Sequence, residues 1–237
     1  MGMRLSSILG NPLAKLSVEI ADMGGMVEKQ LADAILCFDE RDMELARKII
    51  ERDDEIDQRE HRIEEVVTEA LQNRRVSPEQ MTEALAAVRN ANDLERIGDL
   101  AKNIAKRSLV LSECKQTAAH SSVVRMGKIA LRQVSEILDA MARNDYQTAT
   151  AIWAGDQEID EIYNSVFREI LLVMSKDPAD VNALTHLVFV AKNFERVGDH
   201  ATNLAERVYF TATGKRLEGE RSSGDETHLA SPTPEQS

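Results

Sequence analysis

Two pairs of acidic residues, each with its members four positions apart, recur in both halves of the sequence, and each of the resulting four pairs could hold a cation. The pairs are Asp53/Asp57, Glu95/Asp99, Asp156/Asp160 and Glu195/Asp199. In a helix, side chains four residues apart lie on one face, where like charges repel each other. Carboxylate oxygens are ligands that hard metal ions prefer. The spacing therefore predicts a source of positive charge beside each pair.

The acid pairs interrupt apolar helix faces, which predicts that they are partly buried. With about 100° per residue, Tyr163 and Phe167 fall within about 40° of Asp156 on a helical projection. A partly buried carboxylate needs a partner or takes up a proton. Three partners are open: a metal ion, an Arg or Lys such as Arg96 or Arg196, or a proton shared between neighbouring acids.

The acid-bearing segments are repeated within the chain. NDLERIGDLAKNIAKR at 92–107 recurs as KNFERVGDHATNLAER at 192–207, and DDEID at 53–57 recurs as DQEID at 156–160. The same order of motifs in both halves predicts a duplicated three-helix unit. Small residues beside the acids, such as Gly98 and Gly198, favour close helix packing.

Helical periodicity predicts an all-α fold with two tandem, pseudo-symmetric three-helix bundles. The six long helices are expected at 12–40, 42–73, 77–112, 117–143, 145–176 and 178–212. Ser-Pro at 77–78 and Asp-Pro at 177–178 are typical of helix starts. We expect the first bundle at 12–114 and the second at 115–212. The polar segment 213–237 is expected to be disordered.

Composition excludes several functional classes. A net charge of −12 without a basic stripe disfavours nucleic-acid binding. Cys37 and Cys114 form no CxxC motif, so we expect a reduced, cytoplasmic protein. The longest apolar runs, such as ILLVM at 170–174, are too short to span a membrane. Any role at a membrane would therefore depend on partner proteins.

Two alternatives to a cation-binding regulator remain open at this point. A carboxylate-bridged metalloenzyme of the ferritin-like kind would use Glu-x-x-His pairs, and the sequence has none. A metal-free helical scaffold would instead neutralise its acids with arginines. The sequence shows no P-loop, nucleophile elbow or Cys-His pair, so we do not expect an enzyme.

The repeated motifs resemble those of the PhoU family of bacterial phosphate-uptake regulators. LERIGDLAKNIAKR and FERVGDHATNLAER look like the signature of its third and sixth helices, and the resemblance covers about residues 12–212. The resemblance implies that the protein binds metal ions, namely iron, zinc or manganese, as single ions or as multinuclear clusters. The implied ligands are the eight acids of the four pairs, with Asn103 and Asn203 as weaker candidates.

The resemblance also implies a role. Family members are negative regulators of the phosphate starvation response, thought to couple the ATPase subunit of a phosphate ABC transporter to a sensor histidine kinase. A cytoplasmic homodimer that reaches the membrane through these partners is the corresponding expectation. One segment departs from the family pattern: VSPEQMTEALAAVRN at 76–90 stands where members usually carry a QPVAxDLR-like sequence.

Overall fold

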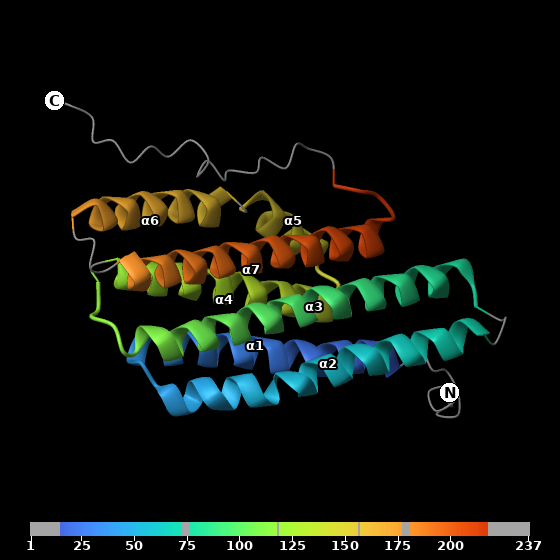
Figure 1. Cartoon of the computed structure of the whole chain (residues 1–237). Coiled ribbons are helices and arrows are strands. Elements are labelled where there is room, and N and C mark those ends of the chain that lie inside the picture. The colour runs from blue at the N-terminus through green and yellow to red at the C-terminus, as the bar shows by residue number, and fades with distance from the viewer. Residues whose placement is uncertain (1–14, 73–75, 118, 156, 177–180, 218–237) are drawn as a thin grey trace.

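The computed structural model describes residues 15–72, 76–117, 119–155, 157–176 and 181–217, and these form a bundle of antiparallel helices (Figure 1). In these ranges the helices are α1 (Leu16–Glu40), α2 (Met43–Gln72), α3 (Pro78–Leu111), α4 (His120–Arg143), α5 (Tyr146–Ala154), α6 (Gln157–Lys176) and α7 (Val181–Thr213). The described residues contain no β-strand. The predicted all-α fold is confirmed.

The helix ends show the duplication at the level of single residues. Arg41 and Asn144 directly follow α1 and α4, and they have left-handed φ angles of 59° and 53°. The next residue in each copy is an aspartate, and it accepts hydrogen bonds from the first backbone N–H groups of the following helix: Asp42 at the start of α2 and Asp145 at the start of α5. Such N-caps satisfy backbone donors that have no partner within the helix.

The helix expected at 145–176 is not continuous, which corrects the sequence prediction. α5 ends at Ala154, and the backbone N–H of Gly155 bonds the carbonyls of Ala151 and Ile152. Glycine is a poor helix former because it loses the most backbone freedom, and it disfavours continuation here. α6 begins at Gln157. Asp156, which was predicted to lie on this helix, is outside the described residues.

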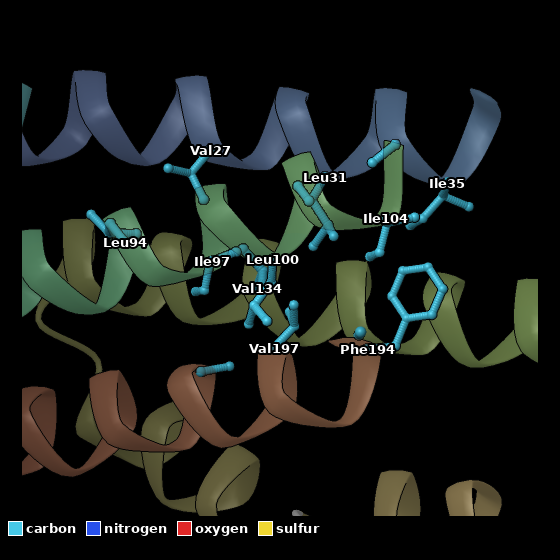
Figure 2. Packing of buried hydrophobic residues seen from close by; sticks show 14 of the residues in the cluster. Val27, Leu31, Ile35, Leu94, Ile97, Leu100, Ile104, Val134, Phe194 and Val197 are labelled. Atoms are coloured by element: carbon cyan, nitrogen blue, oxygen red, sulfur yellow. The ribbon is translucent and has the colours of Figure 1, made fainter. Parts of the chain in front are cut away.

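Two three-helix units pack against each other. α1, α2 and α3 form the N-terminal unit, while α4, α5, α6 and α7 form the C-terminal unit, in which α5 and α6 together take the place of one helix. The units meet where α3 runs beside α7 and α1 beside α4 (Figure 1). Figure 2 shows apolar side chains from α1, α3, α4 and α7 converging at this centre, among them Leu31, Leu100 and Val197.

Glycines lie at close helix contacts. The sequence predicted such contacts for Gly98 and Gly198, where an added Cβ would lie 3.0 Å from Ile56 Cδ1 and 3.0 Å from Ile159 Cγ2. A Cβ added at Gly24 in α1 would lie 2.6 Å from Leu138 Cδ2 in α4, and one at Gly127 in α4 would lie 2.7 Å from Phe194 Cζ in α7. Both distances are too short for a real contact, so with a larger residue at either position the Leu138 or Phe194 side chain would have to move.

In the described ranges, every helix is either too short or too polar to cross a membrane. The predicted disorder of 213–237 concerns residues that mostly lie beyond the described chain, which ends at residue 217. The exact boundaries of the two units remain those of the sequence prediction.

Candidate functional site

The N-terminal acidic cluster is formed by Asp53 and Asp57 on α2 and by Glu95 and Asp99 on α3. Asp53 is almost fully buried, with 1% of its surface exposed. Gln30 on α1 donates a hydrogen bond of 2.7 Å to Asp53 Oδ1 and another of 3.3 Å to the carbonyl of Gly98. The cluster thus joins all three helices of the unit.

A lysine supplies positive charge at this cluster. Lys102 on α3 binds the buried carboxylate of Asp53 and lies 2.6 Å from Asp99 Oδ1. Burial lowers the pKa of Lys102, but its bonds to the two carboxylates outweigh this effect and raise that pKa above the usual range. The lysine side chain is largely covered, with 20% exposed. The charged amine of Lys102 therefore bridges the acidic residues of α2 and α3.

Arg96, an arginine named from the sequence, is more exposed than Lys102 and contacts acids on its own helix. Its side chain is 51% exposed and lies 3.3 Å from Glu95 Oε2 and 3.7 Å from Asp99 Oδ2 on its own helix. Among the described residues Glu95 Oε2 is buried without a hydrogen-bond partner. Burial, and then the charge of Asp99, raise the pKa of Glu95 to about 7.

The C-terminal acidic cluster has Asp160 on α6 and Glu195 and Asp199 on α7. Asp160 and Glu195 are buried, with 6% and 5% of their surface exposed. Lys192 donates to Glu195 Oε1 at 2.9 Å, but within the described chain Oε2 has no hydrogen-bond partner. Burial raises the pKa of Glu195 to about 7; Lys192 opposes this rise, and Asp199 and Asp160 reinforce it.

The two clusters differ at the position of Lys102, where the C-terminal unit has no charged side chain. The counterpart of Lys102 is Thr202, whose hydroxyl donates to the carbonyl of Gly198 at 3.1 Å. Gln133, the counterpart of Gln30, is buried beside Gly198, and its Oε1 lacks a hydrogen-bond partner among the described residues. The C-terminal cluster therefore offers buried oxygen atoms that accept positive charge and has no lysine at the position of Lys102.

The residues fit a metal ion to different degrees in the two units. Oxygen atoms of Glu195 and Gln133 suit a hard cation. In the N-terminal cluster Lys102 already fills that electrostatic role. Across the described ranges no three His, Cys, Asp or Glu side chains are grouped as a metal site. Asp156, one of the predicted ligands, lies outside those ranges.

The structure places the two asparagines that were implied as weaker ligands, Asn103 and Asn203, in different surroundings. Asn103 is exposed. Asn203 donates at 3.3 Å to Asp93 Oδ1, an acid on α3 that belongs to none of the four pairs. The structure thus brings the acids of the two N-terminal pairs together around Lys102. Asn203 instead bonds Asp93.

Asp93 is the centre of a polar network between the units that sequence reasoning missed. It is buried, and on α7 it contacts His200 Nδ1 at 2.5 Å and the guanidinium of Arg207. Arg207 Nε also donates to Asn90 Oδ1 at 2.6 Å. Burial acts to raise the pKa of Asp93, but the bonds from His200, Arg207 and Asn203 hold it below its usual value. The signal in the sequence was a difference between copies, since the counterpart of Asp93 is Asn193.

The fold and its acidic clusters define a class of all-helical proteins built from a duplicated three-helix unit. The family model described as PhoU domain matches the chain twice, at residues 20–108 and 123–208. The chain belongs to the PhoU family. Each of the two matches falls within one of the packed units.

Relatives and solved structures agree with this assignment. The chain is 42% identical over 213 residues to the phosphate-specific transport system accessory protein PhoU homolog of Caulobacter vibrioides, covering 90% of this chain and 93% of the relative. The homolog of the same name from Rhizobium meliloti is 39% identical, with 94% of each chain covered. The crystal structure of PhoU from Pseudomonas aeruginosa superimposes with a TM-score of 0.84 at 32% identity, covering 86% of this chain and 98% of that one.

A second solved structure extends the likeness to a more distant bacterium. The phosphate transport system regulatory protein PhoU from Streptococcus pneumoniae gives a TM-score of 0.80 at 26% identity, over 87% of this chain and 97% of that one. The family consists of regulatory accessory proteins, not enzymes, as the sequence predicted.

Proposed function

We propose that this protein regulates phosphate transport as a cytoplasmic negative regulator of phosphate uptake and of the phosphate starvation response. In this role it couples the ATPase subunit of a phosphate ABC transporter to a sensor histidine kinase. The observation that supports the proposal best is the family match over both units, together with relatives named accessory proteins of the phosphate-specific transport system.

The helical surface is consistent with a coupling role. Both units expose long helices, and a net charge of −12 disfavours nucleic acid as a partner. Phosphate itself is a poor direct ligand for the acidic clusters because like charges repel. Regulation through protein contacts therefore suits this molecule better than direct phosphate sensing by the carboxylates.

Phosphate uptake by a strain that lacks the gene tests this proposal. With ample external phosphate, we expect the deletion strain to take up labelled phosphate faster than the parent, and a plasmid copy of the gene to restore the slower rate. Equal uptake in the deletion and parent strains would contradict a negative regulatory role.

We further propose that the acidic helix faces bind a metal ion, and that the C-terminal cluster is the stronger site. Glu195 Oε2 and Gln133 Oε1 are the buried oxygen atoms that support this. Asp160 and Asp199 are the further carboxylates of the cluster among the described residues. Oxygen ligands favour manganese or iron over zinc, which commonly takes nitrogen and sulfur ligands. Lys102 makes the N-terminal cluster less dependent on metal.

Elemental analysis of untagged protein, purified without chelator, tests metal binding. We expect bound iron or manganese in the wild type and a loss of metal in the Glu195→Gln, Asp199→Asn double variant. The matched control removes two exposed carboxylates from α4, through Glu136→Gln and Asp139→Asn. Metal-free wild-type protein that no metal stabilises against heat would instead favour the metal-free scaffold.

A further inference from the structure

Arg107 on α3 is a half-buried guanidinium without a counter-charge. Its Nη1 donates to His186 Nδ1 on α7 at 3.2 Å, and its guanidinium carbon lies 4.1 Å from the centre of the Phe189 ring. Within the described ranges no carboxylate forms an ion pair with it. Burial alone lowers its pKa, and this is consistent with the lack of a nearby acid. An uncompensated cation is unusual in a chain with a net charge of −12.

The equivalent arginine of the other copy shows what is missing. Arg207 stands 100 residues after Arg107 in the repeat and is neutralised by the buried carboxylate of Asp93. The counterpart of Asp93 is Asn193, whose side-chain nitrogen is buried without a hydrogen-bond partner in the described part of the chain. At one end of the α3–α7 contact, Arg207 is paired with the carboxylate of Asp93. At the other end, the position equivalent to Asp93 carries the neutral amide of Asn193.

Apolar side chains that flank Arg107 are exposed to solvent. Phe189 has 47% of its surface exposed, and Val110, one turn beyond Arg107 on α3, has 38%. Arg107 contacts His186 and Phe189 on α7, and Val110 lies one turn from it on α3; these four residues are here called the Arg107 face. Arginine and aromatic residues are enriched where protein partners bind.

We propose that the Arg107 face docks a segment of a partner protein that carries an acidic side chain next to an apolar one. The partner's carboxylate would supply the counter-charge that Asp93 gives to Arg207, and its apolar side chain would cover Phe189 and Val110. This proposal rests on the proposed function, in which the partner is the transporter's ATPase subunit or the sensor kinase.

The composition of the face favours a protein segment over a small anion. Inorganic phosphate would satisfy the guanidinium but would leave Phe189 and Val110 in water. Bidentate pairing of arginine with a carboxylate, beside buried apolar surface, gives both charge and shape complementarity. Because the chain carries a net charge of −12, it would repel a partner that is acidic throughout, which favours a single acidic side chain within an otherwise apolar or neutral segment.

Binding measurements with single variants test the Arg107 face. The full-length chain is titrated against the purified ATPase subunit and against the cytoplasmic part of the kinase, both encoded in the same genome. Arg107→Gln removes the charge, Phe189→Ala removes the ring, and Val110→Glu gives Arg107 an acid on its own helix. We expect each variant to weaken one of the two complexes by about tenfold or more.

Two control variants remove similar groups elsewhere. Arg143→Gln removes an arginine that is 72% exposed on α4, and Leu172→Ala removes an exposed apolar side chain on α6. Both should bind like the wild type. Circular dichroism melts establish that the variants are folded, and because Phe189 and Val110 are exposed, little loss of stability is expected at these positions.

Four outcomes would overturn the inference. Unchanged binding by all three face variants would exclude the Arg107 face while leaving the proposed function intact. Wild-type protein that binds neither partner would contradict the proposed function and the inference with it. Inorganic phosphate binding that Arg107→Gln abolishes, without any change in protein binding, would identify a small-anion site. Loss of self-association in the variants, with partner binding unchanged, would identify an interface between two copies of the chain.

Discussion

Lys102 links the acidic residues of α2 and α3 in the N-terminal cluster, whereas Lys192 in the C-terminal cluster pairs with Glu195 on its own helix. Lys102 contacts Asp53 and Asp99, whereas Thr202 holds the corresponding place in the second copy. The sequence predicted positive charge beside the acids, from a metal ion, a lysine or an arginine, and the side chains named as examples were Arg96 and Arg196. Lys102 was overlooked because a lysine three residues after Asp99 looks like an ordinary surface pair. Its contact with α2 depends on how the helices pack, which the repeat alone does not specify.

Replacing Lys102 with Met should destabilise the protein strongly. The buried carboxylate of Asp53 would lose its charged partner, and breaking a mostly buried ion pair in this way lowers the free energy of unfolding by about 2 to 3 kcal/mol. Urea unfolding in the presence of chelator measures the change. The control Lys48→Met breaks an exposed pair with Glu44 and should change stability by less than about 0.5 kcal/mol. Equal effects of the two substitutions would contradict a structural role for Lys102.

The raised pKa of Glu195 predicts how its replacement changes stability with pH. Its pKa is about 7 in the folded protein, above the usual glutamate value of 4.5, so the protonated form favours folding. That contribution is fully present below about pH 4.5 and is lost as pH rises through about 7. Glu195→Gln should therefore raise the free energy of unfolding of the metal-free protein at about pH 8 by up to about 3 kcal/mol, with no gain near pH 4.5.

Unfolding of wild type and Glu195→Gln in chelator, at both pH values, checks this prediction. Added manganese should then stabilise the wild type more than the variant, because the variant has lost a charged ligand. A variant that is less stable than the metal-free wild type at high pH would show that Glu195 is satisfied by its protein partners alone.

At the scale of the helices, the sequence predicted helix starts correctly where capping residues and proline define them. Ser77 and Pro78 were predicted to start a helix, and Ser77 forms a capping box with Gln80 at the start of α3. The break at Gly155 was missed because the apolar periodicity continues on both sides of it. Periodicity reports which face is buried, and a single glycine can end a helix without changing that pattern.

The contact between α3 and α7 depends on Asp93, and its loss should weaken the joint between the units. Asp93→Asn would leave Arg207, whose side chain is 18% exposed, without its carboxylate. We expect the free energy of unfolding to fall by about 2 to 4 kcal/mol, as for other buried ion pairs that lose one partner. Thermal unfolding followed by circular dichroism measures this loss.

Asp139→Asn provides the comparison for Asp93→Asn, because Asp139 is 68% exposed and pairs with Arg143 on the same helix. Little change is expected there. A melting temperature for Asp93→Asn that equals that of the control would show that the network does not hold the units together.

For the whole molecule, the duplication was the most informative feature of the sequence. The acid pairs and the small residues beside them recur in the same order in both halves, and together they predicted two three-helix units. The relation between the units could not be predicted in the same way. It depends on positions where the copies differ, such as Asp93 and Asn193, and a repeat reveals what the copies share more readily than what each has changed.

The most direct test of a regulatory role is the activity of an alkaline phosphatase reporter, driven by the phosphate starvation response, in cells grown with plentiful phosphate. The account predicts high reporter activity in a strain that lacks this gene and low activity once the wild-type gene is restored. Low activity that is the same with and without the gene would contradict the proposed function.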